Sequence, residues 1–318
     1  MSVFEKWLPI LQSHASVGLT FSDYSIRMVL FRGNADDLSR LQFWEEWLEP
    51  GIVENGRVKN EQAFSDRLKD MVRALKARGK KTYFAIPDAQ LVLRQFDLQG
   101  ILSDSDLQNY FFIEIGNKIQ LPFEQAVFAF HVIDRSATGT RVLLFAAPEP
   151  VVKQYRKVLA TAGLNPVSAE FSALGIDRWA QYNRPQIAKA QRMYVQLEKE
   201  ALYAAIIQED IPLFVRQVSL KDPESHPSDD ILFLNAATEI ERMLNFYQYS
   251  LQKGLHKVSE IYLLGEPGRM AEFRAILSGT VSLQVQLLAI DHETTQCPDD
   301  VGATLIPAIG LAMKEAVK

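Results

Sequence analysis

The stretch SVGLTFSDYSIRMVLFR, residues 16–32, contains two apolar runs, 17–21 and 26–32, on either side of the polar pair Ser22 and Asp23. That pattern predicts two strands joined by a tight turn. A third strand is predicted over 41–48, and residues 61–77 repeat apolar side chains at helical spacing before Gly79, a residue typical of helix ends. The first half of the molecule is therefore expected to open with a strand meander followed by a helix.

The second half of the sequence repeats this pattern. Strands are predicted over 192–197, 202–207 and 213–220, with Glu209 and Asp210 at a tight turn. A long helix over about 232–251, a strand over 259–264, a helix over 270–277, a strand over 283–288 and a closing helix over 303–316 follow. Two similar α/β halves of this kind suggest an old duplication, with a boundary in the polar segment 183–190.

A small inserted unit is predicted between the opening meander and the end of the first half. Strands over 82–86, 91–98, 127–134 and 141–147 surround a helix over about 104–118, for which Ser103 is a candidate N-cap. A helix over 150–161 and a strand over 167–170 then return to the first half. We expect an N-terminal amphipathic segment (1–15), a first lobe (16–188, with the insertion at about 85–148) and a second lobe (189–318, with a smaller subdomain at about 221–256).

Composition narrows the class of protein. A chain of 318 residues suits two packed lobes, and 34 Lys and Arg against 39 Asp and Glu give no general attraction for nucleic acid. The single cysteine, Cys297, excludes an intramolecular disulfide and is expected to be an inert thiol in a reducing cytoplasm. The longest uncharged apolar run, 301–313, is too short to cross a bilayer, and no signal peptide is recognised. The protein is expected to be cytoplasmic.

The N-terminal segment has one apolar helical face, made by Phe4, Trp7, Leu8 and Leu11. Docking of this face on the body of the protein is the expected role. A membrane-surface anchor is the alternative, but it usually carries several basic residues, and only Lys6 is present.

The order of the predicted elements resembles the PilM and FtsA branch of the actin-like ATPase superfamily. Local sequence is similar to PilM in eight places: VGL (17–19), NGRV (55–58), AIP (85–87), QLPFEQAV (120–127), TAGLNP (161–166), PLFVR (212–216), IYLLG (261–265) and AIGLA (308–312). The resemblance implies an α/β, actin-like (ribonuclease-H-like) fold of two lobes with a small inserted subdomain in the first lobe.

In members of this fold that bind ATP, two hairpin turns hold the nucleotide, each typically with the sequence Asp-x-Gly. Here Thr20 and Ser22 stand at the Asp and Gly positions of the first turn, and Gln196 and Glu198 stand at those of the second. A carboxylate at Glu198 would repel a phosphate and fill the space that a glycine leaves. The resemblance therefore implies a degenerate nucleotide site.

A third nucleotide-binding element of the family keeps Gly265 but continues with Glu266 and Pro267, and proline has no N–H to donate to a ligand. No cofactor is expected, ATP with Mg²⁺ is disfavoured, and no catalytic residue is assigned: the chain is expected to be a pseudo-ATPase. The alternative is a functional actin-like ATPase, or a nucleotide-binding regulator, with substituted phosphate-loop residues.

Other catalytic motifs are weak. The sequence has neither of the common glycine-rich phosphate loops. The segment His292 to Gln296 nearly matches the zinc motif H-E-x-x-H, but glutamine replaces the second histidine, so we expect a solvated turn and no metal site. Thr20 stands where a ribonuclease-H-like nuclease needs a carboxylate on its first strand, which argues against a nuclease.

In PilM, a groove between the first lobe and the inserted unit receives the N-terminal cytoplasmic peptide of the membrane protein PilN. The resemblance thus implies a PilN-like partner, and apolar residues of the insertion are candidates for contacting it, although most are expected to build the core: Leu121, Pro122, Phe123, Phe128 and Phe130.

The expected function is a scaffold of a type IV pilus or DNA-uptake machine that links the partner to the assembly motor. Such a scaffold would lie on the cytoplasmic face of the inner membrane through its partners, without binding nucleic acid. A membrane-tethered, self-polymerising protein like FtsA is the other alternative, although the closing helix leaves no obvious C-terminal tail for a membrane anchor.

Overall fold

The computed structural model describes residues 15–33, 38–185, 187, 190–199, 201–220, 229–295 and 302–316, without the side chains of residues 267, 294 and 295. The expected amphipathic helix over 3–11, Cys297 and residues 221–228 of the expected second-lobe subdomain lie outside these residues. Within them, no helix is both long and apolar enough to span a membrane.

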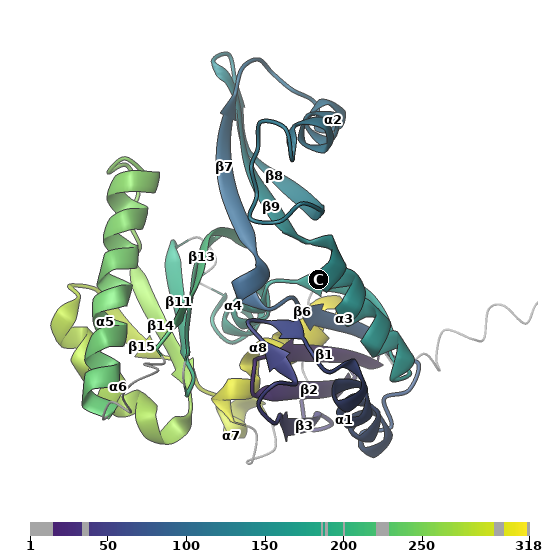
Figure 1. Cartoon of the computed structure of the whole chain (residues 1–318). Coiled ribbons are helices and arrows are strands. Elements are labelled where there is room, and N and C mark those ends of the chain that lie inside the picture. Colours follow the sequence, from purple (N-terminus) through teal and green to yellow (C-terminus); the bar gives the residue numbers. More distant parts are fainter. Residues whose placement is uncertain are drawn as a thin grey trace, which may run out of the picture.

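The first lobe is built on a five-stranded sheet in the order β10-β6-β1-β2-β3 (Figure 1). Its strands are β1 (Ala15–Phe21), β2 (Ser25–Arg32), β3 (Gln42–Trp47), β6 (Lys81–Ala85) and β10 (Asn165–Glu170). The meander β1-β2-β3 is antiparallel, as predicted, and β6 and β10 add parallel to it. Helices α1 (Glu61–Ala74) and α3 (Glu149–Thr161) cover one face, where alternate side chains such as Val17 and Leu19 meet Phe64 and Tyr155.

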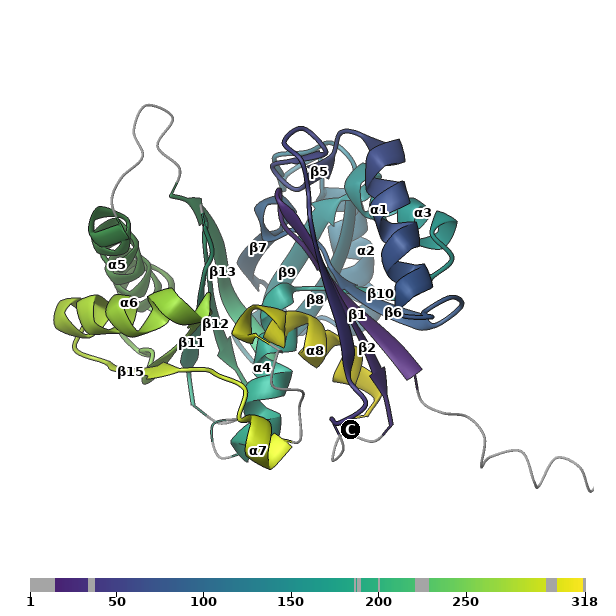
Figure 2. The same cartoon turned by 90° about the horizontal axis from the view of Figure 1, so that it is seen from below.

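Two helices fill the space between the first sheet and the second lobe (Figure 2). Helix α4 (Ser172–Asn183) packs against α8 (Ile306–Ala312), and α8 lies on β1, β2 and β6. Their core joins both lobes, because Phe31 and Trp179 share it with Tyr194 and Ile309. The prediction that the closing helix completes the second half is wrong, because α8 packs on the sheet of the first lobe. Helix α4 was not predicted. The lobe boundaries themselves stay a prediction.

The second lobe repeats the first. Its sheet has the order β13-β12-β11-β14-β15, again an antiparallel meander extended by two parallel strands. The strands are β11 (Arg192–Leu197), β12 (Ala201–Gln208), β13 (Ile211–Ser219), β14 (Glu260–Gly265) and β15 (Gln284–Leu287). Helix α5 (Asp229–Asn245), continued by a π-helical turn (Phe246–Leu251), and helix α6 (Pro267–Thr280) cover one face. Glu209 and Asp210 have positive φ, which confirms the predicted tight turn.

The inserted unit is a three-stranded antiparallel sheet, in the order β7-β9-β8, that projects from the first lobe (Figure 1). It comprises β7 (Val92–Leu98), α2 (Asp104–Glu114), β8 (Ala126–Ser136) and β9 (Gly139–Pro148), and it follows the short 3₁₀ helix η3 (Asp88–Gln90). The predicted Ser103 N-cap is confirmed, with a capping box to Asp106. Helix α2 ends four residues earlier than predicted, because Gly116 has φ 88° and turns the chain back so that its N–H reaches the carbonyl of Ile119.

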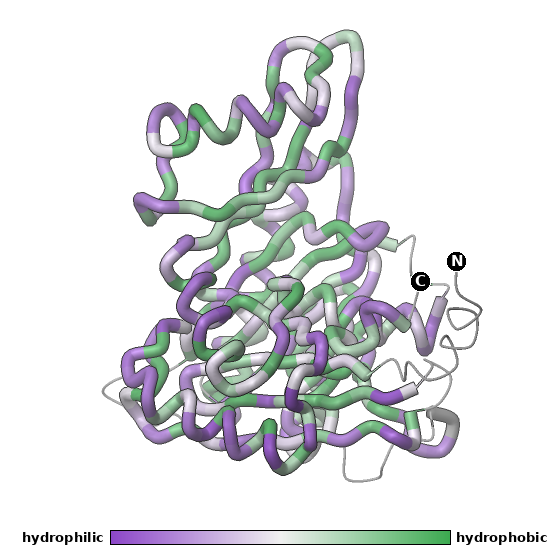
Figure 3. The backbone as a smooth tube through the Cα atoms, turned by 90° about the vertical axis from the view of Figure 1, so that its right-hand side faces the viewer, coloured by the Kyte–Doolittle hydropathy of each residue, from purple (hydrophilic) through white to green (hydrophobic). Residues whose placement is uncertain are grey.

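Hydrophobic and hydrophilic residues alternate along this unit, at the top of Figure 3. Its buried core is correspondingly small and is formed by five side chains: Leu107, Phe111, Ile119, Val142 and Leu144.

Candidate functional site between the lobes

The two hairpin turns that the sequence singled out face each other across the lobes. Thr20 and Ser22 at the end of β1 and Gln196 and Glu198 at the end of β11 line one cavity of about 30 Å³. Gly265 is not part of this lining: it ends β14 beside Leu197, and a Cβ there would lie 2.4 Å from the Leu197 carbonyl oxygen. Four of the five predicted positions therefore come together, and Gly265 has a packing role.

Glu198 is held by three side chains from both lobes. Arg27 of β2 forms an ion pair with it, and Tyr24 donates its hydroxyl hydrogen to it. From its own strand, Gln196 Nε2 donates to Oε1 at 2.5 Å. The Arg27 and Glu198 side chains are only 6% and 3% exposed, and Arg27 also reaches Glu45 at 2.7 Å. The carboxylate in the glycine position is thus neutralised by a cation from the opposite lobe.

We call Arg27, Glu198, Tyr24, Gln196 and Glu45 the interlobe clamp. Burial, followed by the charge of Glu198, raises the pKa of Tyr24 far above its usual value, so this hydroxyl remains a donor at all ordinary pH values. The clamp lies between the two hairpins that the resemblance equates with the phosphate-binding turns of the fold. A cavity of about 30 Å³ has room for roughly one or two water molecules.

Sequence reasoning did not find Arg27 or Tyr24 as site residues. The only available signal was Arg27 itself, a charged residue inside the apolar run 26–32. In the structure its neighbours on the same side of β2, Val29 and Phe31, belong to the core between the lobes.

Asp88 is a third site residue that the sequence did not indicate. It follows β6 in η3, is 9% exposed and accepts a 2.6 Å hydrogen bond from Ser172 Oγ. Its Oδ1 and the hydroxyl of Thr20 are buried without a hydrogen-bond partner in the described part of the chain. Burial raises the pKa of Asp88 to about 6.

The raised pKa predicts that Asp88→Asn stabilises the protein at neutral pH. The folded state holds the Asp88 proton more tightly than the unfolded state, so this contribution to stability is complete below about pH 4 and is lost as the pH rises through about 6. The ionised carboxyl then costs up to about 3 kcal/mol. Urea unfolding should show a gain for Asp88→Asn that is larger at pH 7.5 than at pH 5. Equal changes at the two pH values would contradict the assignment, and Asp70→Asn, in an exposed pair with Arg73, is the control.

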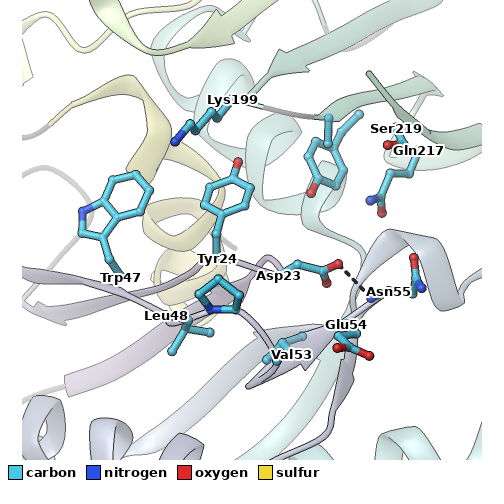
Figure 4. A pocket seen from close by; sticks show the side chains of 14 residues that line it. Asp23, Tyr24, Trp47, Leu48, Val53, Glu54, Asn55, Lys199, Gln217 and Ser219 are labelled. Carbon is cyan, nitrogen blue, oxygen red and sulfur yellow. Dashed lines mark hydrogen bonds between the residues drawn. The ribbon is translucent and has the colours of Figure 1, made fainter. Parts of the chain in front are cut away.

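A larger cavity of about 610 Å³ lies beside the clamp (Figure 4). The first lobe contributes Asp23, Tyr24, Trp47 and Glu54 to its lining, and the second lobe contributes Lys199, Tyr203 and Gln217. The short hairpin of β4 (Val53–Glu54) and β5 (Arg57–Val58) forms one wall. Asn55 and Gly56 at its turn have positive φ, and both donate their N–H groups to the Asp23 carboxylate at 2.8 Å. This turn is the NGRV segment of the sequence.

The five partner-binding candidates divide into two groups. Leu121, Phe128 and Phe130 pack on the inserted unit's own core, with the rings of Phe128 and Phe130 lying 6.2 and 5.9 Å from that of Phe111. Phe123 is half-buried outside that core cluster, and Pro122 is exposed. Three candidates therefore have a structural role, while Pro122 and Phe123 are accessible.

Two apolar side chains of α2 are more exposed than the four half-buried candidates, Leu121, Phe123, Phe128 and Phe130. Phe112 is 76% exposed and Ile113 is 60% exposed. The inserted unit thus exposes apolar side chains on α2, in addition to the accessible Pro122 and Phe123 before β8.

A zinc site finds no support in the described residues, where no group of three or more histidine, cysteine, aspartate or glutamate side chains could hold a metal ion. The expected turn at residues 292–295 is instead a one-turn helix, α7 (His292–Thr295).

Comparison with known proteins agrees with this architecture. A family model described as type IV pilus assembly protein PilM matches residues 18–219. The chain is similar to a solved structure described as a PilM-PilN type IV pilus biogenesis complex, with a TM-score of 0.75 and 16% sequence identity over 95% of this chain and 98% of that chain. It is also similar to the ethanolamine utilization protein EutJ from Carboxydothermus hydrogenoformans, with a TM-score of 0.50 and 11% identity over 96% and 90% of the two chains. No curated protein matches. The likeness to the solved structures confirms the actin-like fold.

Proposed function

Because the chain belongs to the family of type IV pilus assembly proteins PilM, we propose that it is a scaffold subunit of a type IV pilus or DNA-uptake machine. In this proposal it docks the N-terminal cytoplasmic peptide of a PilN-like inner-membrane protein and does not turn over ATP. The observation that carries the proposal is the interlobe clamp: the buried pair Arg27–Glu198 lies between the two hairpins that, by the resemblance, would hold phosphate.

The clamp disfavours nucleotide for a geometric and an electrostatic reason. A triphosphate with its metal needs several times the room of the roughly 30 Å³ cavity. To enter, it would also have to break the buried ion pair and leave the Glu198 carboxylate beside the phosphates, where like charges repel. At the third element, α6 begins with Pro267, which has no N–H to offer a phosphate.

The apolar surface of the inserted unit supports a peptide-docking role. Pro122 and Phe123 are accessible at this unit, and Phe112 of α2 is largely exposed. Strand β8 is at the edge of its sheet. An extended peptide could add its backbone to this edge and place side chains on the apolar surface. The partner would hold the protein at the cytoplasmic face of the inner membrane.

Calorimetry with the partner peptide tests the docking role. We expect the full chain to bind a synthetic peptide of the PilN-like N-terminus, and Phe112→Ser together with Phe123→Ser to weaken binding by about tenfold or more. Trp44→Ser, on β3 of the first lobe, is the control for loss of an exposed aromatic ring. No heat of binding at high micromolar concentrations of both partners would sink the proposal.

The same instrument addresses the alternative of a functional actin-like ATPase or nucleotide-binding regulator. We expect no binding of Mg-ATP at concentrations up to about 1 mM and no phosphate release, because the interlobe clamp, which includes the Glu198 carboxylate, fills the space between the two hairpins. Low-micromolar binding together with phosphate release would favour the alternative and exclude the pseudo-ATPase.

A further inference from the structure

The cavity of about 610 Å³ is distinct from the cavity of about 30 Å³ at the interlobe clamp. Of the residues that line the two cavities, Tyr203 alone is common to both. The volume of the larger cavity falls in the range of ordinary ligand pockets, and both lobes contribute to its walls. The proposed scaffold function does not use this space.

Aromatic ring faces make one side of the cavity. The rings of Tyr24 and Trp47 are stacked, with their centroids 5.9 Å apart and their planes at 18°. The clamp fixes Tyr24, because its hydroxyl is bound to Glu198. Trp47 is 56% exposed, an unusual fraction for a tryptophan that lines a pocket. Stacked, partly open ring faces attract cations through their negative π faces.

The charged groups of the lining favour a positive ligand. Two carboxylates, Asp23 and Glu54, face one ammonium group, Lys199, which gives a net charge of −1. Asp23 accepts two backbone N–H groups and keeps further lone pairs for a ligand. Glu54 forms no side-chain hydrogen bond or ion pair with any other described residue. In Figure 4, Lys199 comes from the wall opposite Asp23 and Glu54, so one end of the cavity is acidic.

We propose that this cavity receives an arginine side chain from the basic cytoplasmic segment of the membrane partner, a proposal that rests on the proposed function. The planar guanidinium group can stack on a ring such as Trp47 while it donates two parallel hydrogen bonds to a carboxylate, which lysine cannot do. Cytoplasmic segments next to membrane spans are enriched in Lys and Arg. The cavity adjoins the base of the inserted unit on its β7 side, because Gln90, just before β7, donates to the carbonyl of Asn55 in the cavity wall at 2.5 Å. Strand β8 is the opposite edge of that sheet, so the arginine would come from a part of the partner's cytoplasmic segment that continues beyond the residues docked at β8.

Fluorescence anisotropy with a labelled synthetic peptide of the PilN-like N-terminus and the full chain tests this proposal. Trp47→Ala and Glu54→Gln should each weaken binding by about tenfold, and Trp47→Phe, which keeps a ring face, should restore most of the affinity. Trp44→Ala is the matched control, since Trp44 lies on the same strand but outside the cavity lining. Replacing one arginine of the peptide with glutamine should cause a similar loss and abolish the further effect of Trp47→Ala.

Lys199→Gln distinguishes the sign of the ligand charge. Removal of this ammonium group should tighten binding of a cationic side chain by a few fold, whereas it would weaken binding of an anion. A peptide that binds wild-type protein but responds to none of the cavity variants, or that binds more weakly to Lys199→Gln, overturns the cavity proposal and leaves the scaffold function standing. Absence of binding to the wild-type chain overturns the scaffold function itself.

Discussion

Replacing Arg27 with methionine is expected to lower the free energy of unfolding by about 3–5 kcal/mol, because it leaves the buried Glu198 carboxylate without its cation. Methionine keeps most of the apolar stem of arginine, so the loss reports the charge rather than the packing. The Glu198 side chain is 3% exposed and cannot turn toward solvent without opening the contact between the lobes. Its remaining donors, Tyr24 and Gln196, are neutral.

A double-mutant cycle isolates the contribution of the pair. Glu198→Gln alone should also destabilise the protein, because the Arg27 guanidinium keeps only Glu45, a partly exposed carboxylate. The double variant Arg27→Met with Glu198→Gln should lose less than the sum of the single variants, with a coupling free energy of about 1–3 kcal/mol in urea unfolding. Arg141→Met is the control: its pair with Asp97 is about half exposed on both sides, and its loss should stay below about 1 kcal/mol. Additive single effects would show that the clamp is not a coupled unit.

The interlobe clamp joins the two lobes. Arg27, Tyr24 and Glu45 belong to the first lobe, whereas Glu198 and Gln196 belong to the second. By the resemblance, the same two turns would hold the nucleotide in ATP-binding members of the fold. An ion pair at that position can therefore hold the lobes together without ATP, which is the property that a binding scaffold needs.

Local sequence pattern was sufficient to predict the elements that an apolar run or an apolar stripe marks. Strands β1 and β2, which are buried on both faces, follow from their two apolar runs, and helix α1 follows from the apolar stripe that includes Phe64 and Leu68. The ends of elements were less accurate. Helix α1 was predicted to reach residue 77 but ends at Ala74, because Lys76 has φ 53°, a left-handed conformation that a helix cannot continue through.

Long-range packing could not be predicted in the same way. Every residue of α8 is buried, so its sequence has no polar face to show which sheet it covers. Helix α4 was missed because its inner side combines small and polar residues with apolar ones: Gly175 lies against α8, and the buried Asp177 pairs with Arg192 of the second lobe. Both contacts join segments that only the folded chain brings together.

For the candidate site, the sequence predicted the positions of the residues but not their interactions. The positions of Thr20, Ser22, Gln196 and Glu198 followed from the resemblance, because the hairpins of the fold are regular. Their chemistry did not follow, because the cation that neutralises Glu198 is 171 residues away in the sequence. The conclusion that Glu198 repels an anion considered this carboxylate alone, whereas the structure shows it neutralised by Arg27.

Gly310→Ala is expected to cost more than about 3 kcal/mol of stability, the second large effect that the structure predicts. A Cβ at position 310 would lie 1.8 Å from the carbonyl oxygen and 2.6 Å from the carbonyl carbon of Gly175 in α4. Both obstructing atoms are backbone, so no side-chain rotation can relieve the collision and the two helices must separate. Separation would disturb the core shared by the lobes, since Trp179 and Ile309 lie on these helices. Gly310 is the central residue of the AIGLA segment, and its close approach to α4 is the physical reason for a glycine there.

A matched glycine on another helix separates this collision from the general effect of alanine. A Cβ at Gly279 in α6 would meet no atom within 4 Å, so Gly279→Ala should be neutral or stabilise the protein by up to about 1 kcal/mol through helix propensity. Thermal unfolding followed by circular dichroism should place Gly310→Ala several degrees below the wild type and Gly279→Ala at or above it. A Gly310→Ala protein with unchanged melting temperature would mean that α4 and α8 do not approach as closely as described. Helices α4 and α8 also form the contact between the lobes, so Gly310→Ala should weaken peptide binding at any site to which both lobes contribute. The cavity lined by Trp47 and Lys199 is such a site, and binding of the labelled peptide there would measure the loss.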